Sequence, residues 1–187
     1  MDAHEGSASQ PEFSERYSNV LDKQYFNFAA AHFLIFADGE REPLHGHNYR
    51  AELEIEGAGL DGAALVADFI QVKPLFKAVC DRLDHRVLLP TRHPRLEVSR
   101  RGDQVEARHR GSLFSFPAAD VVALELENTS SELLARWLAE EVLGELSRAL
   151  PGLRLRRLAV VLSESPGQAA RYERVWSQAT APVAVVA

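Results

Sequence analysis

A run of strictly alternating residues between 45 and 56 constrains the fold more than any other feature of this chain. The apolar members are Tyr49, Ala51, Leu53 and Ile55, and the charged members are Arg50, Glu52, Glu54 and Glu56. Successive side chains of a strand point to opposite faces of a sheet, so this pattern predicts an antiparallel strand with one buried face. The same period places His45 and His47 on the buried face, in line with Tyr49.

A third histidine precedes this strand. Residues 24–34 are rich in aromatic residues and alanine, and they predict a first strand with His32 near its end. If the two strands pair across the loop 36–43, His32 comes opposite His45 and three imidazoles converge. Three neutral imidazoles are typical of a catalytic zinc site, which keeps one position open. A chance His-x-His pair is the alternative, but the grouping and the small Gly46 favour metal binding.

Composition excludes several classes of protein. The 187 residues suffice for one domain with a buried core. The net charge of −6 argues against nucleic acid as the main partner, because nucleic-acid-binding domains usually present a basic surface. The single cysteine excludes an intrachain disulfide, and no apolar run approaches the roughly 20 residues that span a bilayer. Since residues 1–20 also lack an apolar signal segment, we expect a soluble, cytoplasmic protein.

The chain reads as a single domain over residues 23–177. Residues 1–22 lack periodicity and are expected to form a flexible N-terminal extension, and residues 178–187 a C-terminal tail. Residues 92–124, approximately, are expected to be an inserted hairpin with its turn at residues 101–103.

Two helices and two further strands are expected after the central strand. The first helix follows Asp68, and Pro74 suggests that it becomes regular only near Lys73. The second covers residues 129–150 and is followed by strands over 153–164 and 170–176. These elements predict an α+β fold, a sheet with helices on one face.

Several acidic residues are candidates for chemistry. Asp84–His85 can act as an acid–base pair, or can be a favourable helix C-terminus. Glu164 has the parity of the apolar face of its strand, where a carboxylate needs either a structural donor or a ligand. Glu42 lies in the loop beside the three histidines and is either a base or an exposed loop residue.

Two other residues have structural interpretations. Thr129 and Glu132 have the spacing of a capping box, which predicts that Glu132 caps the second helix. Cys80 lies on the apolar face of the first helix and is expected to be a core residue.

Taken together, these motifs resemble the 6-pyruvoyltetrahydropterin synthase / 6-carboxytetrahydropterin synthase family. The matching blocks span about residues 24–176 in the order typical of the family, and together they are highly specific. They are Phe28–Leu34, Leu44–Tyr49, Val66–Phe69, Leu83–His85, Asn128–Ala135 and Val160–Glu164.

The resemblance implies the tunnelling fold, a four-stranded antiparallel sheet with two helices on one face that oligomerises into a β-barrel. It also implies a homotrimer or homohexamer with active sites between subunits, and a pterin as the small-molecule substrate. The zinc ligands it implies are His32, His45 and His47; the catalytic pair is Asp84 and His85; the pterin-binding residues are Ser130, Glu132 and Glu164.

One departure from the family pattern affects the expected reaction. The family's cysteine precedes the His-Gly-His motif by four positions, where this chain has Arg41, and Cys80 cannot replace it by position. Glu42 matches a cysteine-less subgroup in which a glutamate is the base. The resemblance therefore implies cleavage of the side chain of 7,8-dihydroneopterin triphosphate to 6-hydroxymethyl-7,8-dihydropterin.

Three alternatives remain at this point. The chain could instead be a 6-carboxy-5,6,7,8-tetrahydropterin synthase of the deazaguanine pathway or a 6-pyruvoyltetrahydropterin synthase, although the first chemistry is expected to need the cysteine. It could also be a non-catalytic paralogue that binds zinc and a pterin.

Overall fold

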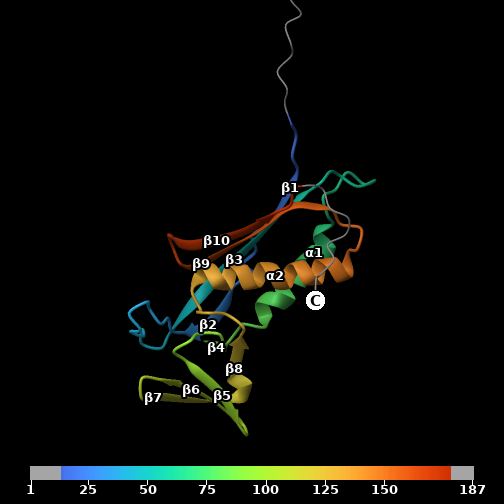
Figure 1. The fold of residues 1–187 in the computed structure, drawn as a ribbon. Helices are drawn as coiled ribbons and strands as arrows, with labels where there is room; N and C mark the ends of the chain where they lie inside the picture. Colours follow the sequence, from blue (N-terminus) through green and yellow to red (C-terminus); the bar gives the residue numbers. More distant parts are fainter. Residues whose placement is uncertain (1–13, 178–187) are drawn as a thin grey trace, which may run out of the picture.

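A computed structural model describes residues 14–177 of the protein. Within this range a seven-stranded sheet has the order β10-β9-β3-β2-β4-β8, with β1 also paired to β3, and a separate sheet has the order β5-β6-β7 (Figure 1). The strands are β1 (Ser18–Leu21), β2 (Phe28–His32), β3 (His45–Gly57), β4 (Arg86–Pro90), β5 (Glu97–Arg101), β6 (Gln104–His109), β7 (Ser112–Pro117), β8 (Val121–Leu124), β9 (Leu155–Ser165) and β10 (Gln168–Val175). The helices are α1 (Phe69–Asp81) and α2 (Ser131–Ala149), with short 3₁₀ turns at Gln24–Phe26 and Ala118–Asp120.

The predicted α+β class is confirmed. Strands β2, β3, β9 and β10 form four neighbouring antiparallel strands, and α1 and α2 cover one face of this sheet (Figure 1). The strand parity of β3 is also as predicted, since Tyr49, Ala51, Leu53 and Ile55 are fully buried against the helices. The sheet is larger than expected, because β4 and β8 extend it with parallel pairing.

The N-terminal boundary of the domain lies earlier than predicted. Residues 18–21, assigned to a flexible extension, form β1 and pair with residues 53–56 of β3. Leu21 is buried, and the Asn19 side chain donates a hydrogen bond to the carbonyl of Ala67 (2.8 Å). The predictions for residues 1–13 and 178–187 lie outside the described residues.

Both helix starts differ from the prediction. Helix α1 begins at Phe69, not near Lys73, because the Asp68 carboxylate caps it by accepting from the amide of Ile70 (2.8 Å). Pro74 therefore lies inside the helix, where burial of its apolar face outweighs one missing hydrogen bond. Helix α2 is capped by Ser130, not Thr129, so the predicted capping box is wrong.

The insertion is a three-stranded sheet and not a hairpin. The turn at Gly102 is as predicted, but a second turn at Arg110–Gly111, with both residues at positive φ, leads into β7. The inserted sheet packs against β4 and the residues that follow β2, and together they form a second apolar cluster. Its buried members are Phe33, Ile35, Leu89, Leu96, Val105 and Ala107. No helix among residues 14–177 is long and apolar enough to cross a membrane.

The sheet face turned away from the helices contains an ion-pair network that predicts an acid-sensitive stability. A hydrogen bond from Arg157, helped by Arg171, lowers the pKa of Glu54 to about 2. Because this folded pKa lies below the ordinary value of 4.5, the stabilisation is complete above pH 4.5 and is lost as pH falls towards 2. In the wild type we expect the urea concentration at half-unfolding to fall steeply between pH 5 and pH 3. Glu54→Gln should make this fall smaller, and the control Glu52→Gln should leave it unchanged. Equal slopes in both variants would contradict the assignment.

Candidate metal centre and active site

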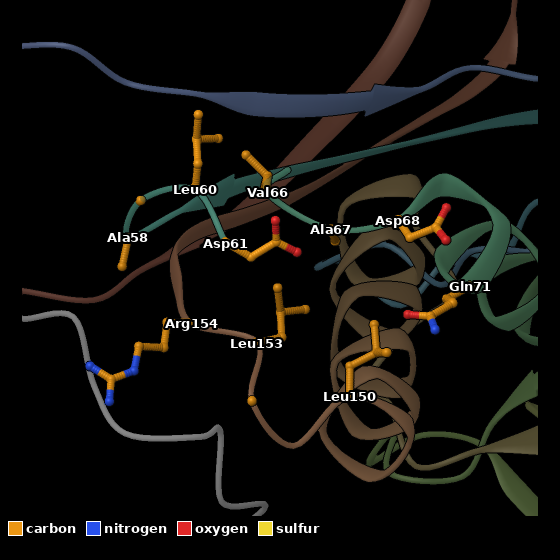
Figure 2. Close-up of a pocket in the computed structure, with 12 residues that line it drawn as sticks. Ala58, Leu60, Asp61, Val66, Ala67, Asp68, Gln71, Leu150, Leu153 and Arg154 are labelled. Carbon is orange, nitrogen blue, oxygen red and sulfur yellow. The ribbon is translucent and has the colours of Figure 1, made fainter. Parts of the chain in front are cut away.

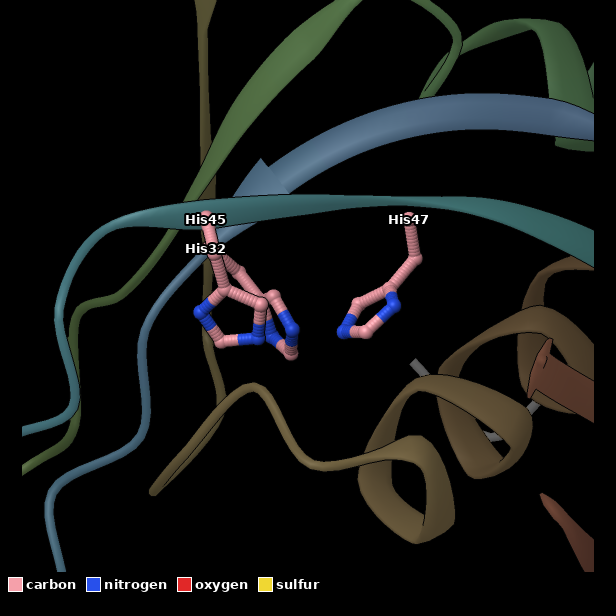
Figure 3. Close-up of side chains that lie close together, drawn as sticks. All are labelled: His32, His45 and His47. Carbon is pink, nitrogen blue, oxygen red and sulfur yellow. The ribbon is translucent and has the colours of Figure 1, made fainter.

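Three histidines meet on the face of the sheet that the helices cover, pointing towards the N-terminal end of α2 (Figure 3). His32 is paired directly with His45 in the β2–β3 register, as predicted, and His47 follows on the same face. One potential ligand atom from each ring lies within 4.8 Å of the others, and the ring centroids are 4.8 to 5.2 Å apart. The cluster can therefore hold a metal ion.

Hydrogen bonds orient two of these rings. The Nδ1 atom of His32 lies 2.8 Å from the carbonyl of Thr129, and that of His45 lies 2.9 Å from the carbonyl of Pro43. Because a carbonyl only accepts, Nδ1 is assigned the proton in both rings, and Nε2 is the unprotonated nitrogen. Burial lowers the pKa of His32, and the neighbouring His45 and His47 lower it further. The lowered pKa favours the neutral imidazole of His32, which is the form that binds a metal.

Tyr49 belongs to the site, although its sequence pattern suggested only a core residue. Its hydroxyl lies 3.2 Å from Nε2 of His32, and burial raises its pKa. The shared parity with His45 and His47 was the available signal, since all three lie on one face of β3. Thr129, whose carbonyl orients His32, had no comparable signal because its contact depends on tertiary packing.

Glu42 lies in the second half of the loop 36–43, where the chain passes beside Leu34, just after β2. Its amide donates to the carbonyl of Leu34 (2.9 Å), and its Oε2 accepts from the amide of Leu34 (3.2 Å). Burial raises the pKa of Tyr49, and the charges of Glu164 and Glu42 raise it further, so both carboxylates act on the residue that contacts His32.

Ser130, Glu132 and Glu164 line one pocket between the start of α2 and the β9–β10 turn. Since Ser130 is the cap of α2, its hydroxyl accepts from the amide of Leu133 (3.4 Å). Glu132 is then in the first turn with an exposed side chain that is free to meet a ligand. Thr129, whose carbonyl contacts His32, directly precedes Ser130 of this pocket, so the pocket adjoins the histidine cluster.

Asp84 and His85 form the expected pair but lie elsewhere. The His85 Nδ1 is 2.9 Å from Asp84, and hydrogen bonds from the Ala29 amide and His85 hold the pKa of Asp84 below its ordinary value against the effect of burial. The His85 side chain is 83% exposed and lines a hollow with residues of β2 and β3 that include Ala30 and His47. Among residues 14–177 the cluster of potential metal ligands consists of His32, His45 and His47, and His85 is not part of it.

A larger hollow of about 560 Å³ lies between the loop after β3 and the turn that joins α2 to β9 (Figure 2). It contains none of the predicted site residues. Its acids Asp61 and Asp68 are engaged locally, because Asp61 accepts from the amides of Ala63 and Leu65 and Asp68 caps α1. We assign this hollow no part in the chemistry.

Fold and site together define a small α+β protein with a cluster of three histidines that can hold a metal ion and a pocket lined by Glu132 and Glu164. The family model described as 6-pyruvoyl tetrahydropterin synthase matches residues 21–175, and the chain belongs to this family of pterin synthase lyases.

Relatives and solved structures agree with this membership. A Methanocaldococcus jannaschii protein, provisionally named a 6-carboxy-5,6,7,8-tetrahydropterin synthase, is 29% identical over 147 residues, covering 79% of this chain and 89% of the relative. The Haemophilus influenzae enzyme of the same name is 42% identical over 64 residues, or 32% of this chain and 45% of the relative. The 6-pyruvoyl tetrahydropterin synthase of Plasmodium vivax superimposes with a TM-score of 0.80 at 30% identity, covering 87% of this chain and all of that chain.

Proposed function

We propose that this protein is a zinc-dependent lyase that converts 7,8-dihydroneopterin triphosphate into 6-hydroxymethyl-7,8-dihydropterin. The observation that carries this proposal is Glu42, whose carboxylate lies in the loop joining the two histidine strands and acts on Tyr49, the neighbour of His32, while position 41 is an arginine and not a cysteine. Two solved structures of the Plasmodium vivax protein support it, since they are variants in which a catalytic glutamate of that protein is replaced by alanine or cysteine.

His32, His45 and His47 would hold the zinc ion. The donor set fits, because two of the rings donate Nδ1–H to carbonyls and leave Nε2 for a metal, and neutral imidazole suits zinc. When bound, zinc supplies a Lewis acid that lowers the pKa of a substrate hydroxyl.

The pterin ring would bind in the pocket beside α2. Glu164 would accept hydrogen bonds from the amino group and ring N–H of the pyrimidine edge, with Glu132 and Ser130 completing the contacts. This anchors the substrate so that its side chain extends towards the histidines and Glu42.

Glu42 would start the reaction by removing the proton of the hydroxyl at C2′ of the side chain. The C1′–C2′ bond then breaks as the C2′ oxygen becomes an aldehyde, and the bonding electrons enter the C6=N5 imine of the ring. A proton delivered to C1′ gives the hydroxymethyl group, and the triphosphate leaves on the two-carbon aldehyde. His85, oriented by Asp84, is the proposed donor of that proton.

Since His85 is not part of the histidine cluster of its own chain, a neighbouring subunit would supply the Asp84–His85 pair. We propose a homotrimer, or a hexamer of two trimers, with the active site between subunits. His47→Ala and His85→Ala chains should each be inactive alone and should regain a substantial fraction of activity when dissociated, mixed and reassembled. Mixtures as inactive as the separate variants would contradict a shared site.

A second candidate is 6-carboxy-5,6,7,8-tetrahydropterin synthesis, which the names of the curated relatives favour. This chain offers no reactive thiol for it, because Cys80 is buried and burial raises its pKa to about 12. Product identification by mass spectrometry after incubation with dihydroneopterin triphosphate separates the possibilities. Hydroxymethyl-dihydropterin supports the proposal, a carboxy or pyruvoyl product overturns it in favour of a sister activity, and unchanged substrate indicates a binding paralogue.

A further inference from the structure

We propose that the inserted sheet β5–β6–β7 is a clamp that positions the loop 36–43, and with it the carboxylate of Glu42. The loop joins β2 and β3, the two strands that contain the histidines. The insertion contacts this loop through three side chains that are far apart in its sequence: Arg95, Arg110 and Phe114. The structural part of this inference stands alone, and only its consequence for turnover rests on the proposed function.

Two arginines of the insertion cover the tip of the loop. Arg95 donates to the carbonyl of Ala37 (3.1 Å), and Arg110 donates to the carbonyl of Asp38 (2.8 Å) and forms an ion pair with Glu40. Gly39 lies under both guanidinium groups, so it is buried although it occupies a turn with φ of +88°. A Cβ there would lie 2.3 Å from Arg95 and 2.4 Å from Arg110, so no other residue fits beneath the two side chains without displacing them.

An aromatic contact holds the returning arm of the loop. The guanidinium of Arg41 lies 4.7 Å from the ring centroid of Phe114 and 5.2 Å from that of Phe33, and the two rings stack at 5.4 Å. Arg41 also donates to the carbonyl of Glu42, its neighbour. Arg41, which occupies the position of the family's cysteine, thus connects Phe114 of the insertion to Glu42, the proposed base.

The loop transmits this restraint because it is internally bonded. Phe36 donates to Glu40 (2.8 Å), Ile35 forms a bridge with Arg41, and Glu42 is bonded to Leu34 through both its amide and its carboxylate. The other side of the clamp is fixed as well, since the insertion packs on Phe33, Ile35 and Leu89 in the second apolar cluster. A loop held at its tip and its arm keeps Glu42 in one position, and small misplacements of a catalytic group cost about 100-fold in rate.

The test is the double variant Arg95→Ala/Arg110→Ala, with Arg100→Ala as the matched control. Arg100 lies in the same sheet, but within residues 14–177 its side chain bonds only to the carbonyl of Gly102 in its own turn. A second pair compares Phe114→Ala with Leu113→Ala, whose side chain is exposed on the same strand. We expect amide hydrogen exchange over residues 36–43 to rise about 10-fold in the double variant and in Phe114→Ala, and to stay unchanged in both controls.

Turnover provides the second readout. In the clamp variants kcat should fall about 10-fold or more, with KM and bound zinc unchanged, and the lysine double variant Arg95→Lys/Arg110→Lys should recover part of it. Unchanged exchange, or the same increase in the controls, would overturn the clamp. Faster exchange with wild-type kcat would overturn its role in positioning Glu42. If the wild-type protein fails to turn over dihydroneopterin triphosphate, the proposed function is wrong. The amide hydrogen exchange of residues 36–43 then still shows whether the insertion restrains the loop.

Discussion

Replacing His47 by alanine is expected to abolish stoichiometric zinc binding and to lower turnover by roughly 1,000-fold or more, because a three-ligand site loses one ligand and the hydroxyl loses its Lewis acid. His47 is the best of the three to change. No hydrogen bond to its ring is found among residues 14–177, whereas His32 is buried and bonded to Thr129. The variant should therefore fold like the wild type, as circular dichroism and thermal unfolding can verify.

The matched control is His93→Ala, a histidine of the inserted region outside the cluster. Its zinc content, measured by inductively coupled plasma mass spectrometry, should remain near one ion per chain. A His47→Ala protein with full zinc content and wild-type turnover would show that the cluster is not the metal site.

The second large effect is expected for Glu42→Gln. The amide side chain keeps an oxygen that accepts from Leu34, so the loop and the zinc content should be preserved. It cannot take up a proton as a carboxylate does, and loss of a general base lowers kcat by about 100- to 10,000-fold. Single-turnover kinetics with dihydroneopterin triphosphate measures this step directly.

Asp38→Asn is the control for an acid in the same loop. Asp38 is exposed and accepts from the amide of Glu40, which asparagine can also do. The control should retain wild-type kcat. If Glu42→Gln turned over substrate at the wild-type rate, another group would have to be the base.

The histidine cluster was predictable because its geometry is local. His45 and His47 share a strand parity, and a single hairpin brings His32 opposite them. The position of Glu42 was predictable for the same reason, because it lies in the loop of that hairpin. Tyr49 followed the same parity but was interpreted only as an apolar core residue.

The placement of Asp84 and His85 could not be obtained in this way. Their position depends on the parallel pairing of β4 with β2, which is a contact between distant segments. Strand β4 is buried on both faces, with Leu88 in one apolar cluster and Leu89 in the other, so its sequence has no alternation to reveal it. Strand β7 had a signal that the hairpin interpretation overlooked, the alternating Phe114 and Phe116 after the Arg110–Gly111 turn.

Helix caps were decided by tertiary contacts. Thr129 and Ser130 are adjacent hydroxyl residues, and either can cap α2 by propensity. Thr129 is buried and its hydroxyl donates to the carbonyl of Phe33 (3.0 Å), which leaves the cap to Ser130. This one-residue shift moves Glu132 out of the capping position and into the pocket with Glu164.

Product formation by metal-depleted and zinc-reloaded protein tests the central claim most directly. The wild-type chain is stripped with a chelator, incubated with dihydroneopterin triphosphate, and assayed by mass spectrometry before and after one equivalent of zinc is restored. We predict no product from the stripped protein and 6-hydroxymethyl-7,8-dihydropterin from the reloaded one. Equal product formation without metal, or a reloaded protein that yields a different pterin, would contradict the account.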